Sequence, residues 1–328
     1  MKKWTAIVLA AVLVFSLTGC KSSDYKKAVS DLNAGNHAAA LSAFQALGDY
    51  KDSRELAKKC EYALAVADFD KGSFESAKAA FQALGDYEAS ADYIVKCDYN
   101  LALAKFDAGD YEAAAEGFRA LADYEDSADY LAKAEKAIFT AKVAGTWVSD
   151  GVNLTTFMVS ILSGQDPILD EVIGEYALPD VIMNVRLELK EDGSFSVSAE
   201  TTGVEEFEAK LTDVMYRYLV VVIENALADQ GYTMEDLYAE AGTDDMDEIF
   251  TMMLGVSLDE YMQIVDIRGQ FEEALESNTE SGTFTAENGK VILDDGELTY
   301  DEEADQLVMQ DRELIPIIGG STLTYHRQ

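Results

Sequence analysis

Apolar and polar positions in the first part of the chain repeat with a period of 37 residues. The stretch Phe81–Tyr87, FQALGDY, has related copies at Phe44–Tyr50 and Phe118–Tyr124. Apolar side chains around them fall mostly at i, i+3 and i+4 spacings, which predicts amphipathic helices. One helical hairpin cannot bury its apolar face alone, so a fixed period of this length predicts a stack of hairpins.

Helix ends within the repeats are marked by glycine and by capping residues. Gly35-Asn36, Gly72-Ser73 and Gly109-Asp110 each place a residue that ends one helix before a residue that begins the next. A second break falls just after each of the three copies. After the first copy, Asp52 and Glu55 have the spacing of a capping box. The predicted helices are residues 25–34, 37–47, 53–70, 74–84, 90–107, 111–121 and 127–142.

The third repeat resembles a known family. Its pattern Gly109-Asp110-Tyr111-x-x-Ala114-x-x-x-Phe118-x-x-Leu121 resembles the tetratricopeptide repeat (TPR), although the period is 37 residues where that family has about 34. The resemblance covers residues 24–142 and implies a scaffold that binds an unidentified protein partner. Tyr50, Tyr87 and Tyr124 either form an interaction surface of this scaffold or fill the seam between its units.

The pattern changes from helical to alternating in the second part of the chain, residues 143–328. Val185–Lys190 alternates strictly between apolar and polar residues, and the turn signals Asp192-Gly193, Asn288-Gly289 and Asp295-Gly296 separate further alternating runs. We expect an antiparallel barrel or meander. The predicted strands are residues 145–149, 185–190, 195–199, 283–286, 291–293, 298–300, 307–309 and 321–325.

Helical patterns interrupt these strands. A long apolar stripe predicts a helix over 204–229, shorter helices begin at Thr233 and Asp244, and Ser257 with Glu260 forms a capping box for a last helix to about residue 277. Residues 165–177 add a small helix. The predicted fold class is therefore α + β: an N-terminal helical solenoid, then an antiparallel β-barrel or meander with a helical insertion over about 204–278.

The first and last predicted strands of the second part resemble those of lipocalin-like domains. The resemblance rests on Gly145-x-Trp147 and on Leu323–Arg327. It implies that Arg327 lies on Trp147 with cation–π character and closes the barrel. It also implies a carrier or sensor of a small apolar ligand, with the helices as a lid.

The chain opens with the features of an export signal. Lys2 and Lys3 precede an apolar run from Trp4 to Leu17 that is too short to be a stable membrane span. The ending Leu17–Cys20 resembles the lipobox of bacterial lipoproteins, which implies a signal peptide over residues 1–20 and a lipid on Cys20. The expected location is extracytoplasmic, with the protein anchored to the bacterial membrane.

Charge is distributed unevenly along the chain. Residues 143–328 hold 40 of the 62 acidic side chains but only 8 of the 25 basic ones. So acidic a surface argues against nucleic acid and anionic lipid as ligands. Calcium is a candidate ligand at clusters such as residues 244–248, but these lack the spacing of an EF-hand, and solvation is the favoured explanation of the charges. We therefore expect neither a metal site nor a cofactor.

Residues able to carry catalysis are few. His37 and His326 fall in different domains, and the sequence has no phosphate-binding loop or dinucleotide fingerprint. We expect a binding scaffold without enzymatic activity and without catalytic residues. The alternatives are the lipocalin-like carrier and a carboxylate-dependent hydrolase of cell-wall material. Cys60 and Cys97 occupy equivalent repeat positions, as small packing residues or as a disulfide.

Overall fold

The computed structural model describes residues 21–164, 166–265, 269, 273, 279–294, 296–309 and 322–328. The chain forms two compact units, one up to Ile138 and one from Phe139 to Gln328. The expected leader and Cys20 lie outside the described residues. The expected boundary between residues 142 and 143 falls inside helix α7 (Ser127–Val143), which begins in the first unit and ends in the second.

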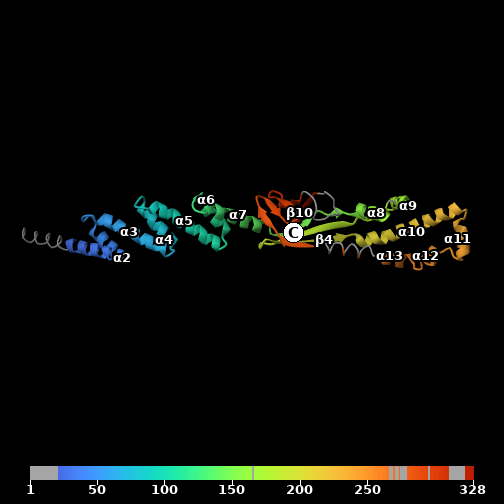
Figure 1. Cartoon of the computed structure of the whole chain (residues 1–328), viewed down its shortest axis with the longest axis horizontal. Helices are drawn as coiled ribbons and strands as arrows, with labels where there is room; N and C mark the ends of the chain where they lie inside the picture. The colour runs from blue at the N-terminus through green and yellow to red at the C-terminus, as the bar shows by residue number, and fades with distance from the viewer. Residues whose placement is uncertain are drawn as a thin grey trace, which may run out of the picture. The chain divides into compact units, whose positions relative to one another are not determined.

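The first unit is a run of antiparallel helices (Figure 1). Residues 21–33 are helical, and the elements that follow are α2 (His37–Leu47), α3 (Ser53–Asp70), α4 (Phe74–Leu84), α5 (Ser90–Asp107), α6 (Tyr111–Leu121) and α7. The predicted helical architecture is confirmed, and the helices from α2 to α7 end within one residue of their predicted bounds.

Each repeat of the first unit contains its own apolar cluster. Phe44, Phe81 and Phe118 are buried at equivalent positions in three separate clusters. Alanines 37 residues apart, Ala40, Ala77 and Ala114, are fully buried in the same clusters. Their small side chains let neighbouring helices approach closely while the phenylalanines fill the remaining space. The 37-residue spacing of these positions therefore reflects the same packing requirement in each repeat of the stack.

Among the predicted N-caps of the repeats, Asp110 accepts a hydrogen bond from the backbone of Ala113, whereas Asn36 and Ser73 make no side-chain cap bond. Asp52 precedes α3 but makes no side-chain hydrogen bond to its first turn, so the predicted capping box with Glu55 is wrong. The Asp52 carboxylate instead accepts a 2.6 Å hydrogen bond from the hydroxyl of Tyr25. At the next position, the buried Ser53 hydroxyl donates to the carbonyl of Tyr50 over 2.6 Å. The connector is therefore held by bonds to distant residues and to its own backbone.

Cys60 and Cys97 are both free thiols in the structure and are fully buried. Each lies in the apolar cluster of its own repeat. Burial raises the pKa of both thiols, which keeps them protonated and weakly reactive. Of the two alternatives that the sequence left open for Cys60 and Cys97, the structure therefore shows small packing residues and not a disulfide.

The second unit contains a nearly closed antiparallel barrel. Its strands are β1 (Gly145–Ser149), β3 (Ile182–Leu189), β4 (Ser194–Thr202), β5 (Glu280–Thr283), β6 (Thr285–Glu287), β7 (Lys290–Ile292), β8 (Glu297–Asp301), β9 (Gln306–Met309) and β10 (Leu323–Arg327). They pair in the order β5-β4-β3-β1-β10-β9-β8-β7-β6. Only Phe284 separates β5 from β6 in sequence, so one short segment joins the two edges of the sheet. The antiparallel prediction is confirmed.

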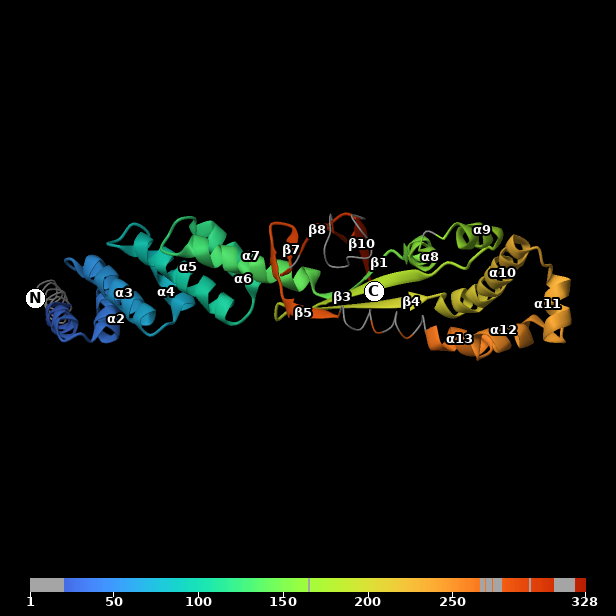
Figure 2. The same ribbon diagram turned by 45° about the vertical axis from the view of Figure 1, so that its right-hand side comes forward.

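Helices pack beyond one end of the β3–β4 ribbon (Figure 2). They are α8 (Thr155–Ser163), α9 (Pro167–Glu175), α10 (Val204–Gln230), α11 (Met234–Ala241), α12 (Met246–Leu254) and α13 (Leu258–Val265). Helix α8 and the short strand β2 (Val152–Asn153) were not predicted. The apolar, β-branched sequence TTFMVSILS of α8 does not distinguish helix from strand by period, and β2 has only two residues. Part of the expected insertion after residue 265 lies outside the described residues.

Helix α10 connects two cores. Phe207, Leu211 and Val214 in its first half belong to the core of the barrel, while Ile223 in its second half belongs to a separate cluster with α12 and α13. The helix starts directly after β4 through Gly203, which has φ +85° and lies against the carbonyl of Asp180. This sharp turn sets the direction in which the insertion leaves the sheet.

Candidate functional site

The three tyrosines expected at the repeat surface pack against other aromatic rings. Tyr50, Tyr87 and Tyr124 are half-buried, and each meets edge-to-face a tyrosine 25 residues earlier in the chain. Those partners, Tyr25, Tyr62 and Tyr99, also contact the buried phenylalanine of the same repeat. The partner tyrosines were not predicted, although their own spacing of 37 residues in the sequence marks them as a repeated position.

Two of the partner tyrosines, Tyr25 and Tyr99, also make polar contacts. The hydroxyl of Tyr99 donates to the carboxylate of Asp126, as Tyr25 does to Asp52, and this bond raises the pKa of Tyr99 to about 12. The ammonium of Lys51 lies 4.2 Å from the ring centroid of Tyr25. These contacts hold Tyr25 and Tyr99 against the half-buried connector tyrosines Tyr50 and Tyr124.

Trp147 and Arg327 come together at the start of the barrel. The indole of Trp147 is fully buried, and its Nε1 donates to the carbonyl of Val143 over 2.9 Å. Cζ of Arg327 lies 4.3 Å from the centroid of the indole. The guanidinium also donates to the carbonyls of Ala144 and Lys142 over 2.7 and 2.8 Å. Arg327 therefore satisfies the open carbonyls at the end of α7 while covering the tryptophan.

A carboxylate completes this arrangement. Asp305 accepts from Nε of Arg327 over 3.2 Å and from the hydroxyl of Tyr300 over 3.0 Å. The arginine holds the pKa of Asp305 below its usual value. Gly145 gives the guanidinium room, because a Cβ there would lie 2.8 Å from Nη1 of Arg327. All polar atoms of this cluster are used in mutual contacts, which is typical of a structural site.

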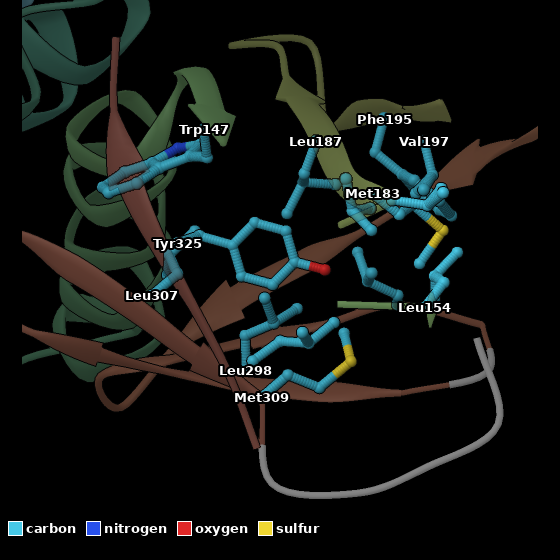
Figure 3. Packing of buried hydrophobic residues seen from close by; sticks show 14 of the residues in the cluster. Trp147, Leu154, Met183, Leu187, Phe195, Val197, Leu298, Leu307, Met309 and Tyr325 are labelled. Carbon is cyan, nitrogen blue, oxygen red and sulfur yellow. The ribbon is translucent and has the colours of Figure 1, made fainter. Parts of the chain in front are cut away.

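The interior of the barrel is filled by side chains (Figure 3). The ring of Tyr325 points into the centre, between Leu187 on one side and Leu298 and Met309 on the other. These residues are buried, and burial raises the pKa of the tyrosine hydroxyl.

The titratable groups considered for catalysis are dispersed. His326 lies on the outer face of β10, 47% exposed at its side chain, with Nε2 2.9 Å from Oδ1 of Asp150. His37 belongs to the other unit. Among the described residues, no group of three or more His, Cys, Asp or Glu side chains is placed to hold a metal ion. The acidic run at residues 244–248 is exposed apart from Met246, and Asp245 caps α12 by accepting from the backbone of Asp247.

A different surface stands out on the helical insertion. Met252 and Met253, at the end of α12, are 63% and 60% exposed, and Leu254 and Tyr261 nearby in the chain are also exposed. We call these four residues the methionine surface. The exposure of this surface was not predicted from the sequence, because apolar residues in a helical pattern are expected to be buried.

No described helix is both long enough and apolar enough to cross a membrane. Comparison with family models, with curated proteins and with solved structures found no match to the chain.

Proposed function

We propose that this chain is a binding protein without enzymatic activity, attached to the outer side of a bacterial membrane by a lipid on Cys20. Its TPR-like repeats would dock a protein partner and display the acidic second unit. The observation that carries the proposal is the packed interior of the barrel, around Trp147 and Tyr325, which leaves outer surfaces for recognition.

The construction of the repeats supports a docking role. The aromatic clusters stabilise each hairpin internally, so the exposed residues of α4 and α6 are free to vary with the partner. Repeats of this kind contact only their neighbours and offer extended surfaces to other proteins. Half-exposed tyrosines such as Tyr87, which packs edge-to-face on Tyr62, add contact area at low entropic cost.

Site-specific photocrosslinking in the producing cell tests the docking role. A photoreactive phenylalanine analogue replaces the exposed residues Gln82 on α4 and Glu116 on α6, and Glu287 on β6 serves as the matched control position. We expect one defined protein adduct from the two repeat positions and none from the control. Adducts from Glu287 alone, or from no position, would contradict docking through the repeats.

The anchor is tested separately by mass spectrometry of the mature N-terminus. We expect a diacylglycerol-modified Cys20 and recovery of the protein in the membrane fraction. The variant Cys20→Ser should be recovered in the soluble fraction. An unmodified N-terminus in the wild-type protein would refute the lipid anchor while leaving the docking result unaffected.

A lipocalin-like carrier of a small apolar molecule is the second candidate; the strand order favours it, while the packed interior counts against it. Apart from β5 and β6, which form the two edges, strands that follow one another in sequence are neighbours in a nearly closed ring, as in small barrels that hold one ligand. Native mass spectrometry of protein purified from the producing cell tests this candidate. A stoichiometric mass excess lost on denaturation would favour the carrier over the scaffold, and the bare chain mass would eliminate it.

A further inference from the structure

The apolar face of α12 continues past the core into solvent. Met246, Ile249 and Phe250 are buried in the cluster that α12 shares with α10 and α13. Met253 follows Ile249 by one helical turn, so the helical period places it on that same face. It is nevertheless 60% exposed, and Met252 beside it is 63% exposed. The apolar face of α12 is therefore buried along most of the helix but exposed to solvent over its last turn.

The composition around this face is unusual. Half of the ten methionines of the chain fall within residues 231–265. Methionine is unbranched and polarisable, and surfaces rich in it adapt to apolar partners of differing shape. Tyr261 on α13 and Tyr232 before α11 add exposed aromatic rings to the same segment. Such a surface is suited to receiving apolar side chains from another molecule.

Charge identifies the kind of partner. Residues 231–265 carry nine acidic side chains and no lysine, arginine or histidine, and all nine are exposed. They include Asp244, Asp247 and Glu248 on or beside α12 and Asp259 and Glu260 on α13. A second copy of this chain would bring the same negative charge, and an anionic lipid surface would be repelled. An occupant that satisfies both features has apolar side chains flanked by positive charge.

We propose that the methionine surface, Met252, Met253, Leu254 and Tyr261, binds a cationic amphipathic peptide segment of a protein partner. The segment would place its apolar face on the methionines and its lysine or arginine side chains against the surrounding carboxylates. Helix-in-groove recognition of this type uses apolar anchors at helical spacing, with charge setting orientation and association rate. This site rests on the proposed binding function and adds a second docking surface to it.

Fluorescence anisotropy tests the proposal with the chain from Lys21 to Gln328, which holds every described residue. The probe is a labelled 18-residue helix with leucine on one face and lysine on the other. Two reference peptides accompany it: one with glutamate in place of lysine, and one of the same composition in scrambled order. We expect saturable binding of the first peptide alone, weakening as salt is raised.

Two variants locate the site. Met252→Ser combined with Met253→Ser keeps the charge but removes the apolar anchors, and we expect it to raise Kd roughly tenfold or more. Ile292→Ser removes an exposed apolar side chain from β7 of the barrel, and it should change Kd by less than about twofold. Circular dichroism establishes that both variants fold.

Other outcomes overturn the proposal. Equal binding of the scrambled peptide, or an unchanged Kd in the double serine variant, would reduce the effect to general attraction by net charge. Binding to phosphatidylcholine vesicles that the serine variant loses would assign the surface to lipid. A dimer that dissociates in the same variant would assign it to a second copy. None of these results bears on the crosslinking from the repeats, so the two proposals fail independently.

Discussion

Arg327 lies over the indole of Trp147 and at the same time donates to the backbone carbonyls at the end of α7. One side chain thus covers the tryptophan of the first strand and ends the helix that precedes it. Arg327 and Ala144 are 183 residues apart in sequence. The pair therefore fastens the last strand of the barrel to its beginning.

Replacement of Arg327 by alanine should destabilise the second unit by about 2–3 kcal/mol, because two carbonyls lose a charged donor and the indole loses its cover. Trp147 is the sole tryptophan after Trp4, so its fluorescence during urea unfolding reports on this unit directly. The control is Lys290→Ala, which removes an exposed ion pair with Glu297 and should cost less than about 1 kcal/mol. Equal effects of the two substitutions would contradict the role given to Arg327.

The pH dependence of stability should carry the signature of Asp305. Its pKa is lowered in the folded state, chiefly by Arg327. A lowered pKa contributes stability that is present above the unfolded value, about 3.9, and is lost as pH falls through the folded value. Wild type should therefore be more stable than Asp305→Asn at pH 7, with the difference shrinking as pH falls below 4.

Urea titrations of both proteins between pH 3 and pH 7 measure this difference. Asp166 and Asp192 also have lowered pKa values, so both proteins lose stability in acid and only their difference is informative. A difference that stays constant with pH would show that the asparagine acts through packing and not through the charge of Asp305.

Gly203→Ala should destabilise the second unit by about 3 kcal/mol or more, because a Cβ would lie 2.2 Å from the carbonyl oxygen of Asp180. The matched control is Gly231→Ala, at φ +79° and with no atom within 4 Å of the added Cβ. That substitution isolates the cost of the left-handed backbone, about 1 kcal/mol. Thermal unfolding of both variants compares the two, and equal losses would refute a steric role for Gly203.

Ala122→Gly should stabilise the repeats by about 1 kcal/mol. Ala122 has φ +52° and ψ −117°, and the equivalent positions Gly48 and Gly85 adopt nearly the same backbone. A side chain is strained in that region, and relief of the strain exceeds the entropy that glycine adds to the unfolded chain. Circular dichroism at 222 nm follows unfolding, with Gly85→Ala as the reciprocal variant, which should lose a similar amount. A lower Tm for Ala122→Gly would contradict the argument.

Much of the first unit could be predicted from sequence because its period repeats the same packing three times. The bounds of α2 to α6 followed from glycine and capping positions, and the alternation in Val185–Lys190 located β3. The contact between Arg327 and Trp147 is distant in sequence and was expected only from the resemblance of the two strands to lipocalin-like domains.

The remainder depends on tertiary contacts that local patterns do not contain. Asp52 has the spacing of a capping residue, but its carboxylate bonds Tyr25 because the stack brings that hydroxyl within reach. Met253 has the period of a buried residue, yet the core that its face enters ends one turn earlier. Periodicity predicts which face of a helix is apolar, but only the tertiary arrangement of the helices determines how far along the helix that face is buried.

The pairing of β1 with β10 has a consequence for the order of folding. One edge of β1 pairs with β10, where Trp147 lies opposite Arg327. This edge can form its hydrogen bonds only after β10 has been synthesised. The repeats, in contrast, complete their contacts within adjacent hairpins and can condense as the chain emerges. β1 can pair with β3 before β10 exists, but its other edge stays unpaired until β10 arrives, and a premature stop in translation would leave that edge open.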